Sequence, residues 1–152
     1  MLFLPELTLL GAGLVLFLLS LSKPSSGKIK IVATSLAIVT LLATLLCLNS
    51  EGSLFYAAYK VDFFSQFFKV LIAAATLILL LFSDKLSGIA EEVQSEYYLF
   101  LFMSVLGLMM LVSSVELLSI FVSLELSSFA VYVMVPMRKT GQLGSQSEAG
   151  IK

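Results

Sequence analysis

The sequence predicts an all-α membrane protein, a bundle of transmembrane helices. Of its 152 residues, 59% are hydrophobic and only 12% are charged, a composition typical of membrane proteins rather than soluble domains. The apolar residues form long runs separated by short polar stretches. A run of about 17–25 apolar residues crosses a bilayer as a helix, whereas the strands of a membrane barrel are shorter and alternate polar with apolar residues. The runs therefore predict helices.

Five runs of this length follow one another along the chain. A short KPSSGK turn follows the first run, a loop with Glu51, Lys60 and Asp62 follows the second, and the acidic stretch DKLSGIAEEVQSE follows the third. Only Glu116 separates the fourth run from the fifth, which predicts a very tight turn. The predicted transmembrane helices are residues 2–22, 29–48, 63–83, 97–115 and 117–137.

The last residues, 138–152, predict a cytoplasmic linker that leads to a sixth helix. They begin with a basic pair and continue as TGQLGSQSEAGIK, in which a linker of small and polar residues precedes an amphipathic start. We expect the chain to be the front part of a longer protein.

The distribution of Lys and Arg predicts the orientation, because cytoplasmic loops carry an excess of these residues. The odd-numbered connections hold six of them and the even-numbered side holds two, Lys60 and Lys69. We therefore expect the odd-numbered connections in the cytoplasm and the N-terminus outside. The six are Lys23, Lys28, Lys30, Lys85, Arg138 and Lys139.

The composition also excludes several functions. The chain has no histidine, so a Ser-His-Asp triad and a Cys/His metal site are both excluded. Its single cysteine, Cys47, has no partner within the chain for a disulfide. The net charge of −1 offers no basic patch for nucleic acid.

Glu125 is the main candidate for a functional residue. It lies near the middle of the run 117–137 and is the only charged residue in it. A charged side chain at that depth costs about 2.5–3.5 kcal/mol by insertion measurements, and intramembrane carboxylates often mark proton pathways. We therefore expect Glu125 to face a polar interior and to take part in moving protons or ions. The alternative is a structural acid that bonds to a neighbouring helix, with Ser128 on nearly the same face.

Other polar residues have simpler explanations. Glu116 is interpreted as an interfacial carboxylate in water. Lys69, about two turns into the third helix, is either a member of a proton relay or, as we prefer, a side chain that extends to the membrane surface. Small and flexible side chains predict close helix packing: Ser119, Ser123 and Ser127 in the fifth helix and Met103, Gly107, Met109 and Met110 in the fourth.

Three stretches resemble one known family. They are EYYLFLFMSVLGLMMLVSSVELLSIFVSLELSSFAVYVMV, the SEAGIK end, and KVDFFSQFFKVLIAAATLILLL at the third helix. They closely resemble the antiporter-like membrane subunits of respiratory complex I. The best match is subunit N of the proton-pumping NADH:quinone oxidoreductase, the bacterial relative of mitochondrial subunit 2. The L-E-L-S-S core with the downstream E-A-x-x-K is the most specific part of the match.

The resemblance implies roles for two residues. Glu125 matches the family's fifth-helix glutamate, which belongs to the proton-translocation machinery. Lys152 matches the lysine of E-A-x-x-K that opens the sixth helix near the buried polar axis. In the family the glutamate is paired with a lysine on the seventh helix, within a fold of about fourteen helices that contains two inverted repeats. These later helices lie beyond the sequence.

The resemblance also implies partners and a location. We expect a proton-translocating subunit in the bacterial inner membrane that couples quinone reduction by NADH to proton transfer. It would assemble with other membrane-arm subunits. No cofactor is expected in this chain, because NADH, FMN, the iron–sulfur clusters and quinone bind partner subunits in the family. Two alternatives remain: a subunit of a multi-subunit sodium/proton antiporter, and a membrane scaffold without transport activity.

Overall fold

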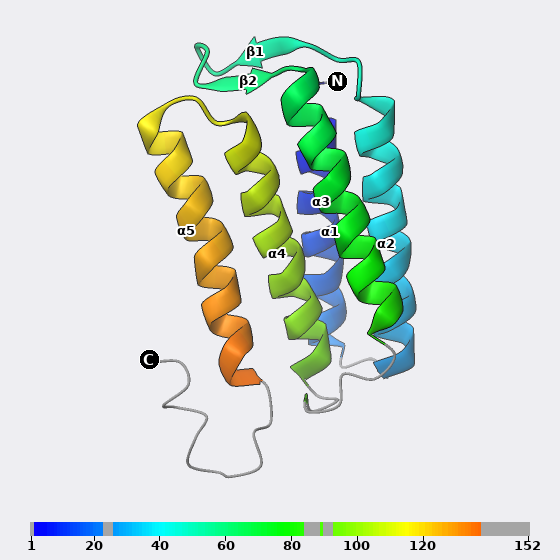
Figure 1. Cartoon of the computed structure of the whole chain (residues 1–152). Coiled ribbons are helices and arrows are strands. Elements are labelled where there is room, and N and C mark those ends of the chain that lie inside the picture. Colours follow the sequence, from blue (N-terminus) through cyan, green and yellow to red (C-terminus); the bar gives the residue numbers. More distant parts are fainter. Residues whose placement is uncertain (1, 23–25, 84–88, 90–92, 138–152) are drawn as a thin grey trace.

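The computed structural model confirms the predicted helical bundle. It describes residues 2–22, 26–83, 89 and 93–137. Five long helices lie side by side with their axes nearly aligned, and each is long and apolar enough to cross a membrane (Figure 1). The helices are α1 (Leu4–Leu21), α2 (Ser26–Leu46), α3 (Phe63–Phe82), α4 (Gln94–Ser113) and α5 (Leu117–Met134), and a short 3-10 turn, η2 (Val135–Met137), follows α5.

The core of the bundle is shared by α1, α2, α3 and α4. Helix α1 packs against α2 and α4, and α3 packs against the same two helices. Leu16, Leu80, Phe102 and Met109 are among the fully buried side chains at its centre. Helix α5 lies at one edge and packs mainly against α4 (Figure 1). Most of its surface is therefore left uncovered by the other described helices.

A β-hairpin covers the end of the bundle at which α1 and α3 begin (Figure 1). The loop expected between the second and third helices contains two antiparallel strands, β1 (Gly52–Leu54) and β2 (Tyr59–Val61). The hairpin is joined to the tight α4–α5 turn, because Tyr59 forms a β-bridge with Ser114 and the Val115 N–H donates to the Ala58 carbonyl at 3.0 Å. We call this side the hairpin end.

The hairpin tip has an unusual backbone. Phe55, Tyr56 and Ala57 have φ angles of 53°, 55° and 67°, in the left-handed region. Each non-glycine residue there costs roughly 1–2 kcal/mol. Aromatic packing offsets this cost, since the rings of Phe3, Phe55 and Tyr59 meet edge to face with centroids 5.5–6.4 Å apart. The tip therefore holds β2 over the start of α1.

Helix α3 begins directly after the hairpin with a reciprocal cap. The Asp62 carboxylate accepts from the Ser65 N–H at 2.8 Å, and the Ser65 hydroxyl accepts from the Asp62 N–H at 2.9 Å. The hydrogen bond from the Ser65 N–H lowers the pKa of the Asp62 carboxyl, with smaller contributions from the Ser65 hydroxyl and Lys60. The cap satisfies backbone groups that the first turn leaves free. It thereby fixes where α3 begins, and with it the register of the side chains that α3 turns inward.

Gly107 allows α4 and α5 to approach closely. A Cβ atom at this position would lie 2.6 Å from the Ser127 nitrogen and 2.9 Å from the Ser123 carbonyl oxygen. Both are backbone atoms of α5, so neither can move aside alone. The expectation that Gly107, Ser123 and Ser127 serve close packing agrees with this contact.

Replacing Gly107 with alanine is therefore expected to separate α4 from α5. We expect the free energy of unfolding to fall by about 1–3 kcal/mol, the usual cost of overpacking. The melting temperature of the purified full-length protein measures it. Gly11→Ala is the matched control, because a Cβ at Gly11 meets nothing within 4 Å. Equal melting temperatures for the two variants would show that the α4–α5 contact is not tight.

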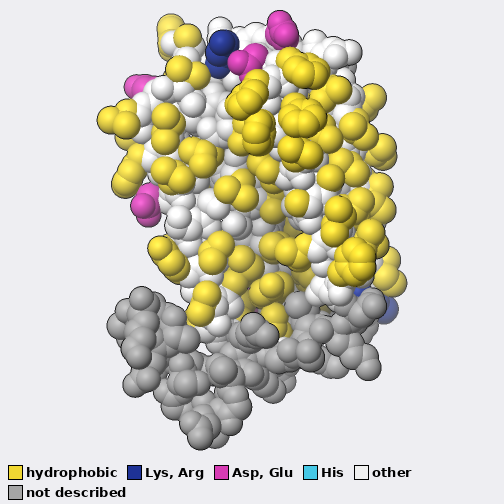
Figure 2. All heavy atoms as spheres, viewed as in Figure 1, with side chains coloured by type: hydrophobic (Ala, Val, Ile, Leu, Met, Phe, Trp, Pro, Cys, Tyr) yellow, Lys and Arg dark blue, Asp and Glu magenta, His cyan; other side chains and the backbone are white. Residues whose placement is uncertain are grey.

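The outer surface of the bundle suits a bilayer. Figure 2 shows one face covered mainly by hydrophobic side chains, with most of the visible charged side chains toward the hairpin end. Exposed large apolar residues include Leu14, Ile31, Phe64 and Phe121 from four different helices. Such a surface is stable only where lipid or further protein covers it.

Candidate functional site

Glu125 lies on the outward face of α5. The inward face is formed by Ser123, Ser127 and Ala130, which are buried against the bundle. At 100° per residue, Glu125 points nearly opposite to Ser123. Its side chain is exposed, and within the described part of the chain it has no hydrogen bond or ion pair. These five helices therefore do not themselves supply the polar interior expected around Glu125.

Glu125 stands at the centre of a regular apolar stripe. Leu118, Phe121, Phe129 and Tyr132 lie at i−7, i−4, i+4 and i+7 from it, and all four are exposed. This spacing places them on one face, which is the pattern of a helix that packs against another helix. None of the other described helices covers this stripe, so lipid or further protein must cover it.

Lys152, the second candidate from the sequence, lies outside the described residues. So do the remaining residues of the expected cytoplasmic linker, 138–152. The structure therefore does not place Lys152 relative to Glu125, and its role remains a prediction.

A buried cluster of charged and polar side chains lies at the hairpin end. Lys69 of α3 is fully buried, and its Nζ lies 2.7 Å from Oε1 of Glu6, which is also fully buried. Tyr59 of β2 donates a short hydrogen bond to the same oxygen. The Lys69 Nζ also donates to the Tyr59 hydroxyl at 3.2 Å and lies 5.1 Å from the centre of its ring. We call Glu6, Tyr59 and Lys69 the buried triad.

Tyr59 is held as a hydrogen-bond donor. Burial, together with the charge and hydrogen bond of Glu6, raises the pKa of Tyr59 far above its usual value. The nearby Ser113 hydroxyl of α4 lowers the pKa of Tyr59, as the smallest of these influences. Its geometry does not meet the criteria for a hydrogen bond to the phenol. The phenol therefore stays protonated and bridges the acid and the base.

Several polar atoms around the triad have no partner among the described residues. They are the second carboxylate oxygen of Glu6, both amide atoms of Gln66, and the Ser113 hydroxyl. Gln66 is fully buried and lies one turn before Lys69 on the same face of α3. The site thus contains hydrogen-bond donors and acceptors that the described side chains leave unsatisfied.

The preferred interpretation of Lys69 is wrong. Its ammonium does not extend to the membrane surface but ends in the buried ion pair. No role was predicted for Glu6 or Tyr59 from the sequence. One feature of the sequence could have indicated the pair. Glu6 and Lys69 carry opposite charges, and each lies within two turns of the start of its helix; α1 and α3 begin on the same side of the bundle.

Two pairs of serine hydroxyls join α4 and its C-cap to α5. Ser104 pairs with Ser127 at 3.2 Å and Ser114 with Ser123 at 3.3 Å, while Ser119 donates to the Glu116 carbonyl. These bonds explain the serines as groups that hold two helices together. Glu116 is exposed at the start of α5, as a carboxylate in water would be.

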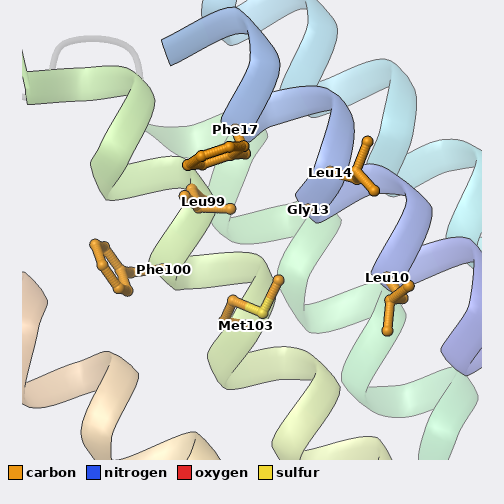
Figure 3. Close-up of a pocket in the computed structure, with 7 residues that line it drawn as sticks. All are labelled: Leu10, Gly13, Leu14, Phe17, Leu99, Phe100 and Met103. Atoms are coloured by element: carbon orange, nitrogen blue, oxygen red, sulfur yellow. The ribbon is translucent and has the colours of Figure 1, made fainter. Parts of the chain in front are cut away.

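An apolar pocket lies between α1 and α4 (Figure 3). Its volume is about 330 Å³. With no polar side chain in its lining, it cannot bind an ion or a proton. The lining residues are Leu10, Gly13, Leu14, Phe17, Leu99, Phe100 and Met103.

Metal binding has no support among the described residues. Nowhere in that part of the chain do three Cys, Asp or Glu side chains gather as a metal ion would require. The chemical features that the structure does contain are therefore the buried triad and the outward carboxylate of Glu125.

Comparison with known proteins gives close relatives. The chain is 42% identical over 137 residues to NADH-quinone oxidoreductase subunit N 2 of Opitutus terrae, a match that covers 90% of this chain and 29% of the relative. It is also 42% identical over 151 residues to the subunit N 2 of Syntrophobacter fumaroxidans, covering 99% and 32%. No family model matches the chain.

The fold has a counterpart among solved structures. A chain in the structure of respiratory complex I from Thermus thermophilus with bound aureothin superposes with a TM-score of 0.76 at 23% identity. The match covers 97% of this chain and 31% of that chain. The chain thus spans about a third of the length of the proteins that it matches. By its sequence similarity and its fold, the chain belongs to the NADH-quinone oxidoreductase subunit N family.

Proposed function

We propose that the chain is part of a proton-translocating subunit in the membrane arm of an NADH:quinone oxidoreductase. The subunit would couple the reduction of quinone by NADH to proton transfer across the membrane. The observation that carries the proposal is the 42% identity to subunit N proteins over nearly the whole chain. NADH, FMN, the iron–sulfur clusters and quinone would be bound by partner subunits.

The proposed role of Glu125 depends on the rest of the subunit. A carboxylate in the middle of a membrane helix needs a polar partner, because its charge costs about 2.5–3.5 kcal/mol there. We propose that further helices pack on the stripe around Glu125 and supply that partner, with Lys152 close to the same polar axis. The relatives are about three times as long as this chain, which supports the presence of such further helices in the subunit.

We propose an inner-membrane location with the hairpin end outside. The odd-numbered connections carry six Lys and Arg residues. On the opposite side, the charge of Lys69 is neutralised by its buried ion pair with Glu6. Lys60 is then the one residue on that side that counts toward the Lys and Arg bias. The bias toward the cytoplasmic side is therefore stronger than the sequence alone indicates.

Purification of the full-length subunit from its native membrane tests the proposal. We expect the tagged subunit to copurify with NADH:quinone oxidoreductase activity. In proteoliposomes, the purified material should move protons when NADH and quinone are added. Proton movement driven by a sodium gradient, without NADH oxidation in the purified material, would instead identify the antiporter alternative. Copurified NADH oxidation without proton movement would support a scaffold.

A further inference from the structure

We propose that the buried triad, together with Gln66 and Ser113, is a second proton-binding site, hydrated and located at the hairpin end. It is distinct from Glu125, which points away from the bundle on another helix. The inference rests on the proposed function, because one of the two measurements that test it is proton transport. The ligands of the proposed site are a proton and water.

The structural alternative is a salt bridge that only holds α1 to α3. Stability explains such a pair poorly, because desolvation of two charges costs several kcal/mol per ion and apolar replacements are often as stable. A purely structural pair is also expected to satisfy its remaining polar atoms. In the described part of the chain, the second Glu6 oxygen and the neighbouring Gln66 amide and Ser113 hydroxyl find no partner.

Those unpartnered atoms fit water. Buried polar groups are almost always hydrogen-bonded to protein or to ordered water, and a buried water makes about three hydrogen bonds. Gln66 offers both donors and acceptors, the second Glu6 oxygen accepts, and the Ser113 hydroxyl does either. Water bound among them would connect α1, α3 and α4 beside the ion pair.

The triad has the connectivity that proton exchange needs. The Lys69 ammonium donates to the Tyr59 hydroxyl, and Tyr59 donates to Glu6. When the phenol proton moves to Glu6 and a Lys69 proton replaces it on Tyr59, the ion pair becomes a neutral amine and a neutral acid. No atom is oxidised and the total charge is unchanged. A proton taken from water onto the carboxylate instead gives the site one positive charge.

Few other titratable groups influence the site. Cys47 follows the last residue of α2, and burial raises the pKa of its thiol, so the thiol stays neutral; Glu6 raises this pKa further and Lys69 lowers it, both by smaller amounts. Lys60 and Asp62 pair with each other at 3.6 Å on the exposed side of the hairpin. With the hairpin end outside, the site would lie on the side at which protons leave.

The test uses the intact complex in proteoliposomes with three variants of the full-length subunit. Glu6→Gln with Lys69→Met removes both charges together, Tyr59→Phe removes only the bridging hydroxyl, and Lys60→Gln with Asp62→Asn is the control for an exposed pair. We expect all three to assemble. The number of protons moved per NADH should fall in the first two and stay at the wild-type value in the control.

A wild-type proton ratio in both the charge-free variant and the Tyr59→Phe variant would overturn the proposal and leave a structural salt bridge. If the wild-type complex itself moved no protons, the proposed function would fail instead. A second readout does not depend on transport. A structure of the complex that shows ordered water should place it within hydrogen-bond distance of Gln66 and Ser113, whereas a dry cluster would overturn the hydrated site.

Discussion

Replacing Lys69 with methionine is expected to prevent stable accumulation of the subunit. The change leaves the fully buried Glu6 carboxylate without its cation. Removing one partner of a buried pair costs about 3–5 kcal/mol, a large part of the total stability of most proteins. The amount of subunit in the membrane, together with the melting temperature of the purified protein, measures the effect.

Two variants separate this effect from a general loss of lysine. Lys60→Met removes a lysine of β2 whose side chain is 63% exposed, and exposed pairs are worth about 0–1 kcal/mol. We expect near wild-type levels for it. Adding Glu6→Gln to Lys69→Met should restore accumulation, because no unpaired charge then remains. If Lys69→Met alone accumulated normally, Glu6 and Lys69 would not form the ion pair described.

The five helices were predictable because each depends on a property of a continuous segment. An apolar run of sufficient length has few alternatives in a membrane, so composition and spacing decide the outcome. The hairpin was not predictable in this way. Its strands have three residues each, and its tip places Phe55, Tyr56 and Ala57 in a conformation that sequence patterns associate with glycine.

The two charged sites differ in what the sequence could reveal. Glu125 was identifiable because a single charge inside an apolar run has a clear cost, but the direction of its side chain depends on which face of α5 packs on α4. The triad required contacts of α1 with β2 and α3, which lie more than 50 residues further along the sequence. Within its own helix, Lys69 suggested a side chain that extends to the membrane surface. Its partner Glu6 became visible only in the folded bundle, in which α1 and α3 both pack on α2 and α4 and bring the two charges together.

Replacing Glu125 with glutamine is expected to produce the largest effect on transport. Glutamine keeps the size and hydrogen-bonding capacity of the side chain but cannot take up and release a proton at this position. Assembly should survive, because Glu125 makes no contact that holds the described helices together. The proton translocation rate should fall by about tenfold or more, since a positioned proton-transfer group typically contributes at least that factor.

Glu116→Gln is the matched control for this change. It alters the same residue type in the same segment, but at the exposed start of α5. We expect the Glu116 variant to translocate protons at the wild-type rate, which would separate a loss at the helix centre from a loss of any acid in this helix.

The most direct measurement is therefore the number of protons moved per NADH oxidised by the intact complex carrying Glu125→Gln, in proteoliposomes beside the wild type and Glu116→Gln. We expect a fully assembled complex whose proton ratio falls well below the wild-type value, with the Glu116 variant unchanged. An assembled Glu125→Gln complex with the wild-type proton ratio would contradict the account and leave Glu125 as a structural residue.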